Sequence, residues 1–268
     1  MPANAIAHGA GGPRRSLSEW AIEQSEIVLA LARRDFKTRF DQNFFGYSWT
    51  FIAPLVWVAA TYGMFYFMGR QSPVYTDLIT FIISGLIPYA SFRYVINSMG
   101  RMAGVTRPLL IFPTLAREHA VIAGALVEFG NMLFLAAAIM AANYLAFGNF
   151  ELDNFPMWFA GMALAWLLGA AYAYFFVVLS RDNPTLFQLG IVILRPTYFI
   201  SGVFFIPNEL RGDVLRIFSW NPLLHAIEIS RDGMLFHYTS HVADPGYVLL
   251  CIAVMFGSAV AIRIWRGD

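Results

Sequence analysis

The chain has 268 residues, of which 58% are hydrophobic and only 13% are charged, and its mean hydropathy is +0.58. Because soluble domains carry about 25% charged residues, this composition excludes an ordinary soluble globular protein and indicates an integral membrane protein. The net charge of +1 says nothing about nucleic acid, but no basic cluster is long enough to follow a phosphate backbone, so no nucleic-acid partner is expected. Cys251 is the only cysteine, so no intrachain disulfide is possible.

The N-terminal region divides into two parts. Residues 1–15 are rich in alanine and glycine, and we expect a disordered arm without a cleaved signal peptide. Ser16 and Glu19 fit a capping box at the start of a helix that runs to about Phe40, within a predicted interfacial segment 16–45. The acidic residues come early and the basic residues late, on one arc of the helix. We expect it to lie in the inner membrane surface, as an anchor or as a docking platform for a partner.

Six apolar stretches follow, each long enough to cross a hydrocarbon core about 30 Å thick. They form a predicted transmembrane domain, 46–268, with spans at 47–68, 77–98, 119–147, 157–180, 186–206 and 246–264. We therefore predict an all-α integral membrane protein with six transmembrane helices. The fourth span is rich in the small residues that allow close helix packing, most simply within the chain itself.

The basic residues give these spans an orientation. With the N-terminus inside, the inner segments hold twelve Lys and Arg residues and the outer segments hold four. Because cytoplasmic loops carry the excess of basic residues, both termini are predicted to be cytoplasmic. The inner connection 99–117 contains Gly and Pro residues and should form short broken helices. The outer connection 207–245 is apolar at near-helical spacing around Asn221-Pro222, which predicts two short re-entrant helices.

Three ionisable residues fall within the predicted spans, where a charge is costly and usually faces a cavity or a partner. Arg195 lies midway along the fifth span, Glu128 lies in the third, and Arg93 lies near the inner end of the second. Arg195 could pair with Glu128, or it could neutralise an anionic substrate. Arg93 could extend to the lipid phosphates. Deep aromatic residues in the same spans suit sugar rings and ordinary packing equally well: Trp57, Tyr62, Tyr66, Tyr198 and Phe199.

No nucleotide site is predicted in this chain. A phosphate-binding loop needs Gly-x4-Gly-Lys-Ser/Thr, whereas the only lysine, Lys37, follows Phe36. Any ATP hydrolysis must therefore come from another chain. His237 and His241 have a spacing that could hold a metal on a helix, but no further convincing ligand is evident, so solvated loop histidines are expected.

Catalytic chemistry is also poorly supported. No acid pair in an outer loop has an evident spacing for acid–base catalysis. Glu228 and Arg231 are three residues apart on a presumed short helix, and we expect them to form an ion pair.

Several motifs resemble polysaccharide-export ABC transporter permeases. They are Arg34–Arg39 (RDFKTR) followed by Phe45–Trp49 (FGYSW), Gly85–Tyr89 (GLIPY), Arg195–Ser201 (RPTYFIS) and, most specifically, Trp220–His225 (WNPLLH) continuing to Arg231. These motifs run in family order over most of residues 30–265. The similarity is strongest to the capsular polysaccharide exporter permeases (KpsM type), and O-antigen and teichoic-acid exporter permeases are relatives.

The resemblance implies a homodimer of six-span subunits in the bacterial inner membrane, bound to two copies of a cytoplasmic ABC ATPase subunit. ATP and Mg²⁺ would then bind to that ATPase, and this chain would be a transporter subunit without a cofactor or a catalytic site. The implied substrate is a lipid-linked anionic polysaccharide. A periplasmic adaptor or co-polymerase and an outer-membrane export channel could be further partners.

The resemblance also implies roles for particular residues. The expected ATPase contacts are Arg33, Arg34, Lys37, Arg101, Arg107, Arg117 and Glu118. The expected substrate path contains Trp57, Tyr62, Tyr66, Arg195 and Tyr198. The expected extracytoplasmic gate, within 207–232, contains Pro207, Trp220, Asn221, Pro222, His225, Glu228 and Arg231.

Three other functions compete with polysaccharide export. An ATP-driven exporter of drugs or lipids would need no aromatic path along the chain. An integral-membrane enzyme acting on lipid-linked sugars would need a reactive cluster in an aqueous loop, and the sequence shows none. A non-catalytic scaffold would not need the rare charges inside the spans. Polysaccharide export is therefore the favoured function.

Overall fold

The computed structural model describes residues 17–41, 44–105, 116–148 and 152–267, and all of its regular secondary structure is helical. The predicted all-α class is confirmed. The helices are α1 (Leu17–Asp41), α2 (Phe44–Phe67), α3 (Leu78–Val105), α4 (Arg117–Phe147), α5 (Phe155–Leu179), α6 (Thr185–Ile193), α7 (Thr197–Ile200), α8 (Gly212–Phe218), α9 (Pro222–Met234) and α10 (Pro245–Arg266), with a 3-10 turn η2 (Pro207–Glu209). The predicted arm and Ser16 lie outside the described residues.

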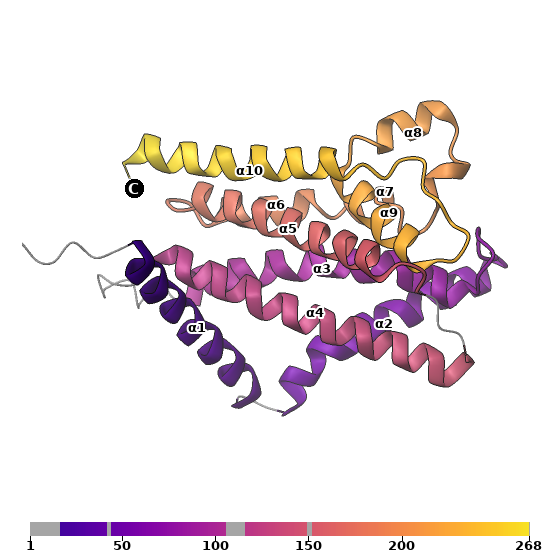
Figure 1. Cartoon of the computed structure of the whole chain (residues 1–268), viewed down its shortest axis with the longest axis horizontal. Helices are drawn as coiled ribbons and strands as arrows, with labels where there is room; N and C mark the ends of the chain where they lie inside the picture. The colour runs from indigo at the N-terminus through magenta and orange to yellow at the C-terminus, as the bar shows by residue number, and fades with distance from the viewer. Residues whose placement is uncertain (1–16, 42–43, 106–115, 149–151, 268) are drawn as a thin grey trace, which may run out of the picture.

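Within the described residues, four helices are long and apolar enough to cross a membrane, namely α3, α4, α5 and α10. They lie alongside one another along the long axis of the molecule (Figure 1). They match the second, third, fourth and sixth predicted spans within a few residues at most ends. The exception is α3, which continues to Val105. The prediction of broken helices from residue 99 is therefore wrong for 99–105, because no proline interrupts the helix there, while 106–115 lie outside the described residues.

The fifth predicted span, 186–206, is not one continuous helix. Helix α6 ends at Ile193, α7 forms a single turn, and the chain then bends through residues 201–205. Two residues explain the breaks. Pro196 has no backbone N–H to donate and disfavours helical geometry in the residue before it, and Gly202 adopts a left-handed φ of +79° that glycine tolerates.

Close backbone contacts build the core around α5. A Cβ atom at Gly161 would lie 2.2 Å from the backbone nitrogen of Ser230, and one at Gly233 would lie 2.2 Å from that of Trp158. A Cβ at Gly169 would lie 2.6 Å from the Phe92 carbonyl oxygen. Helix α5 can therefore touch α9 and α3 only because these positions are glycine. The small residues of the fourth span serve packing within the chain, as predicted.

Helix α1 confirms the predicted N-terminal helix and packs obliquely against α4 at one end of the molecule (Figure 1). Val28 and Leu31 are buried there with Met102, Ala120 and Ala123. The C-terminal end of α10 lies at this same end, whereas α8 and α9 lie at the opposite end (Figure 1). The two ends of the molecule therefore carry different groups of residues.

Candidate functional site

A group of charged residues joins α1 to α3 and α4; we call Asp35, Arg39, Ser98, Arg101 and Glu128 the ionic cluster. Asp35 has only 2% of its side chain exposed, and Arg101 donates to its two carboxylate oxygens over 2.8 and 3.2 Å. Arg39 lies 3.0 Å from the same carboxylate, 3.2 Å from Glu128 Oε2 and 3.0 Å from Ser98 Oγ. Two arginines thus bridge three helices.

The electrostatics of the cluster favour ionised Asp35. Burial would raise the pKa of the Asp35 carboxyl, but the hydrogen bonds and charges of Arg101 and Arg39 outweigh burial and hold the pKa below its ordinary value. A buried carboxylate is tolerated when its charge is paired and its oxygens are hydrogen-bonded. The cluster therefore fixes α1 on α3 and α4 at neutral pH.

The ionic cluster overturns one sequence-based expectation. Glu128 pairs with Arg39, so the alternative in which Arg195 pairs with Glu128 is wrong. The reason is tertiary: α1 docks against α4 and brings Arg39 to Glu128, a contact between residues 89 positions apart. Sequence reasoning missed Asp35, Arg39 and Ser98, although the Asp35–Arg39 spacing of four on a helix was an available signal.

The other predicted ATPase contacts are scattered. Arg33 and Lys37 are exposed and Arg34 is half-buried on α1. Glu118, in the first turn of α4, forms an ion pair with Arg263 of α10 at 3.2 Å. Arg117 begins α4, and Arg107 lies outside the described residues.

Aromatic rings connect α2, α3 and α7; we call Trp57, Tyr89, Tyr198 and Phe204 the aromatic cluster. Trp57 and Tyr198 stack with centroids 5.1 Å apart and an interplanar angle of 15°. Tyr89 packs edge-on against Trp57 at 5.6 Å, and Phe204 packs edge-on against Tyr198 at 4.7 Å. The Tyr198 hydroxyl lies 3.3 Å from Thr61 Oγ1 on α2. The structure thus brings together two of the predicted path residues.

The remaining predicted path residues lie around this cluster. Tyr62 and Tyr66, farther along α2, stack on each other at 6.3 Å, and Tyr66 is 68% exposed. Arg195 is exposed at the turn between α6 and α7. Its side chain is therefore accessible on the surface of a single chain, three residues before Tyr198.

A second charge group lies at the opposite end; we call Ser84, Glu228, Arg231, Tyr238 and Ser240 the buried anchor. The predicted Glu228–Arg231 ion pair is confirmed at 2.5 Å, and both side chains are 0% exposed. The Arg231 guanidinium also donates to Ser84 Oγ at 3.1 Å and to the carbonyls of Phe205 and Gly202 at 3.2 and 2.7 Å. It covers the Phe81 ring at 4.8 Å.

Both oxygens of the Glu228 carboxylate in the buried anchor accept hydrogen bonds. Glu228 Oε2 accepts hydrogen bonds from the Tyr238 hydroxyl at 2.5 Å and from Ser240 Oγ at 2.9 Å. Burial and the Glu228 charge raise the pKa of Tyr238, so this hydroxyl keeps its proton and remains a donor. The anchor therefore fastens α9 to α3, to residues 202–205 and to the loop after α9.

The break at Asn221-Pro222 separates α8 from α9, as the sequence predicts. The Asn221 side chain accepts from the Leu223 N–H at 3.1 Å, while its amide donates to Ser201 Oγ at 2.8 Å. The other predicted gate residues have different surroundings. His225 Nε2 lies 2.8 Å from the Ser219 carbonyl, Trp220 is 77% exposed, and Pro207 is buried in η2.

The histidines considered as metal ligands do not share a helix. His237 and His241 lie in the non-helical stretch between α9 and α10. Within the described ranges, no group of three or more His, Cys, Asp or Glu side chains could hold a metal ion.

Comparison with known proteins adds independent information. The family model described as ABC-2 type transporter matches residues 26–235. The "Polysialic acid transport protein KpsM" of Escherichia coli is 26% identical over 248 residues, which cover 91% of this chain and 95% of that protein. "Capsule polysaccharide export inner-membrane protein CtrC" of Neisseria meningitidis serogroup A is 25% identical, covering 95% and 97%. "Capsule polysaccharide export inner-membrane protein BexB" of Haemophilus influenzae is 26% identical, covering 83% and 84%.

Proposed function

The chain belongs to the ABC-2 type transporter family, and from that premise we propose that it is the transmembrane permease subunit of an ATP-driven exporter of lipid-linked capsular polysaccharide. One observation carries the proposal: three capsule-export or polysialic-acid transport proteins align with 83% to 95% of this chain. The resemblance read from the sequence motifs is thereby confirmed. The anionic glycan, its lipid anchor and the assembly remain parts of the proposal.

We propose six crossings of the bacterial inner membrane, with α2 and the broken α6–α7 segment added to the four long helices. The arginines at the helix ends support an orientation in which α1 faces the cytoplasm. Arg101, Arg117, Arg181, Arg263 and Arg266 all lie at or near helix ends on the side of α1. The excess of arginine on that side favours a cytoplasmic location for α1 and both termini. Helices α8 and α9 then lie on the outer side.

We propose that two copies of this chain form a homodimer and that each binds a separate cytoplasmic ATPase beneath α1. The exposed Arg33 and Lys37 suit acidic partners on that surface. The ionic cluster supports a mechanical role for α1, because Asp35 and Arg39 connect it directly to α3 and α4. A push on α1 from a closing ATPase would therefore reach two membrane helices.

The substrate path is proposed along α2 and α7. Trp57, Tyr198 and Phe204 of the aromatic cluster are half-buried, so the parts of these rings that remain exposed could contact sugar faces. Arg195 lies three residues before Tyr198, with its side chain exposed. Arg195 would neutralise acidic groups of the glycan. Several large apolar side chains on the exposed face of α2 suit a second copy across the path, among them Leu55, Val56 and Phe67. Helices α8 and α9 would close its outer end.

The test is reconstitution with the cognate ATPase. Co-purification should yield a stable complex, and lipid-linked capsular polysaccharide should stimulate its ATP turnover. Arg195→Ala should reduce this stimulation and cut export in cells while leaving assembly intact, because Arg195 is exposed. Arg181→Ala, at an exposed arginine between α5 and α6 and away from α2 and α7, serves as the matched control. Failure to bind any ABC ATPase would overturn the proposed function, and full export by Arg195→Ala would remove this arginine from the path.

A further inference from the structure

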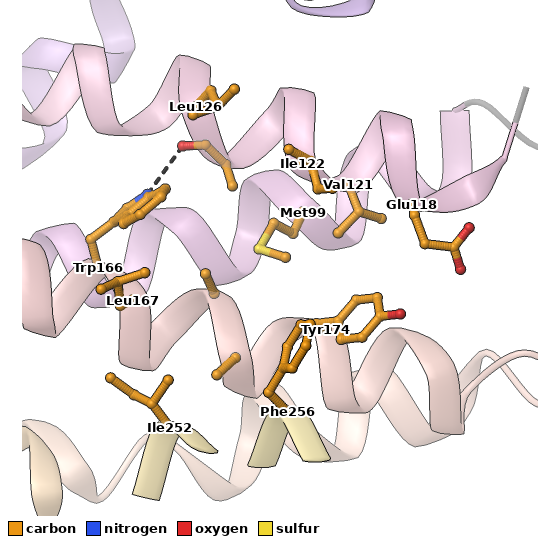
Figure 2. Close-up of a pocket in the computed structure, with 13 residues that line it drawn as sticks. Met99, Glu118, Val121, Ile122, Leu126, Trp166, Leu167, Tyr174, Ile252 and Phe256 are labelled. Carbon is orange, nitrogen blue, oxygen red and sulfur yellow. Dashed lines mark hydrogen bonds between the residues drawn. The ribbon is translucent and has the colours of Figure 1, made fainter. Parts of the chain in front are cut away.

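An apolar groove of about 370 Å³ lies between α4, α5 and α10, with Met99 of α3 reaching into it (Figure 2). Its walls include Ile122, Leu126, Leu167 and Phe256. The indole of Trp166 donates its hydrogen bond to the Ala125 carbonyl at 3.1 Å (Figure 2), so this polar group is already satisfied. The groove therefore suits an apolar ligand along most of its length.

One end of the groove is polar. Glu118 lies at this end with the Tyr174 hydroxyl (Figure 2). Arg263 of α10 lies 3.2 Å from Glu118 and donates to the Tyr174 hydroxyl at 3.0 Å. The Arg263 side chain keeps 32% of its surface exposed, so its guanidinium can also contact a group at the mouth of the groove. The end is basic overall, because the nearby helix ends add Arg117, Arg181 and Arg266 against Glu118 and Asp182.

The dimensions of the groove match one leaflet of a bilayer. Glu118 and Leu126 mark its extent on α4, a helical rise of about 12 Å. Half of a hydrocarbon core is about 15 Å thick. Its volume falls within the range of about 300–1,000 Å³ that ligand sites usually occupy. An acyl chain that enters beside Arg263 would thus end near Trp166, about midway through the membrane.

We propose that this groove is a binding site for an anionic phospholipid of the leaflet that faces α1. One acyl chain lies between α4, α5 and α10, and the phosphate lies against Arg263. The site rests on the membrane placement given under the proposed function, but it is separate from the substrate path along α2 and α7. Helix α10 packs mainly on α5 and α9, so the bound chain fills the space between α10 and α4.

A second groove provides a control. It lies near the other ends of α4 and α5, has a volume of about 650 Å³, and is lined by Met140, Ala141, Phe155 and Trp158 among others, without a basic residue. It is also apolar, so a ligand held by apolar contact alone would occupy both grooves. Only the groove beside Arg263 should distinguish anionic from zwitterionic headgroups.

The experiment is native mass spectrometry of the purified chain, equilibrated with equal amounts of phosphatidylglycerol and phosphatidylcholine of the same acyl composition. The wild type should retain one phosphatidylglycerol per chain. Ala170→Phe, which fills the groove, should lose most of it, whereas Ala141→Phe in the control groove should keep it. Arg263→Gln should reduce the preference for phosphatidylglycerol about fivefold, because one arginine near the surface contributes about 1 kcal/mol.

The outcomes separate the alternatives. Equal retention of phosphatidylglycerol and phosphatidylcholine by the wild type would overturn the proposal. Full retention of phosphatidylglycerol by Ala170→Phe would also overturn it, and so would a glycolipid bound to the wild type in place of the phospholipid. Leu167→Trp, at a more exposed wall position, replaces Ala170→Phe if that variant does not fold. Neither the ATPase nor the glycan takes part in this experiment, so a negative lipid-binding result would not contradict the proposed export function. Likewise, failure of the chain to bind an ATPase would not change the measured number of lipids retained per chain.

Discussion

The two charge groups at opposite ends of the molecule are built differently. In the ionic cluster, Arg101 and Arg39 keep 41% and 16% of their side chains exposed while they bind buried carboxylates. In the buried anchor, both Glu228 and Arg231 are 0% exposed. In both groups the carboxylates are buried, so loss of an arginine would leave an unpaired buried charge, but only in the buried anchor is the cation buried as well. The ionic cluster therefore holds α1 with arginines that still reach solvent, whereas the buried anchor holds α9 with a pair that is wholly enclosed.

The largest expected effect comes from breaking the buried anchor. Arg231→Gln leaves Glu228 buried without its cation, and removal of one partner of a buried pair costs about 3–5 kcal/mol. We expect a large fall in the thermal unfolding midpoint of the detergent-purified protein and low recovery as a monodisperse species. The double variant Glu228→Leu with Arg231→Met removes both charges and should recover part of this stability. An unchanged unfolding midpoint for Arg231→Gln would show that the buried anchor does not stabilise the fold.

A smaller effect is expected from the ionic cluster. Asp35→Asn replaces charged hydrogen bonds to Arg101 and Arg39, which contribute about 1.5–3 kcal/mol each in buried settings and less here because the arginines reach solvent. We expect faster amide hydrogen exchange in α1, an unchanged rate in α9, and weaker stimulation of the bound ATPase. Glu26→Gln, at an exposed position of the same helix, is the control. Equal acceleration in α1 and α9 would mean that the cluster supports the whole fold and not α1 alone.

The aromatic cluster lies between the ionic cluster and the buried anchor. Substitutions in it should lower the stability less than substitutions in either of these groups. Tyr198→Leu removes the stack on Trp57, and such aromatic pairs contribute about 0.5–1.5 kcal/mol beyond burial. We expect a small loss of stability together with reduced export of polysaccharide. Tyr198→Phe keeps the ring and loses only the contact to Thr61, so export should stay near wild type. If both variants lose export equally, the hydroxyl rather than the ring face contacts the glycan.

The smallest effect is expected when the pH is changed near neutrality, because the contribution of Asp35 to the stability of α1 should not change there. The folded-state pKa of Asp35 lies below its ordinary value of 3.8, so its stabilising contribution is fully present above that value and is lost as pH falls through the lowered one. The ratio of the α1 protection factors of the wild type and Asp35→Asn, which removes the intrinsic pH dependence of exchange, should therefore be constant from about pH 5 to pH 8. A difference that disappears near neutral pH would show that Asp35 is not held ionised by its arginines.

Helix positions were largely predictable because long apolar stretches leave the backbone few alternatives in a membrane. The ends of α5 and α10 lie within two residues of the predicted spans. The break at Asn221-Pro222 was also predictable, since proline begins a helix readily and asparagine caps it. The broken fifth span was missed because its hydropathy is continuous, although Pro196 and Gly202 interrupt the helix.

The candidate sites were predicted unevenly for a physical reason. Glu228 and Arg231 are three residues apart on one helix, so local spacing alone placed them together. Glu128 has its partner 89 residues away, and only the docking angle of α1 selects Arg39 over Arg195. Local geometry is encoded in the spacing of residues, whereas contacts between helices depend on how whole surfaces fit.

Composition, apolar length and short motifs were enough to establish the helical class, the membrane character and the family, because they depend on residues close together in the chain. The pairing of the charges, the contact of α5 with α9 at Gly161 and Gly233, and the apolar groove that ends beside Arg263 came from the packed helices alone. These features arise from packing between distant segments, where a difference of a few ångströms decides whether two groups meet.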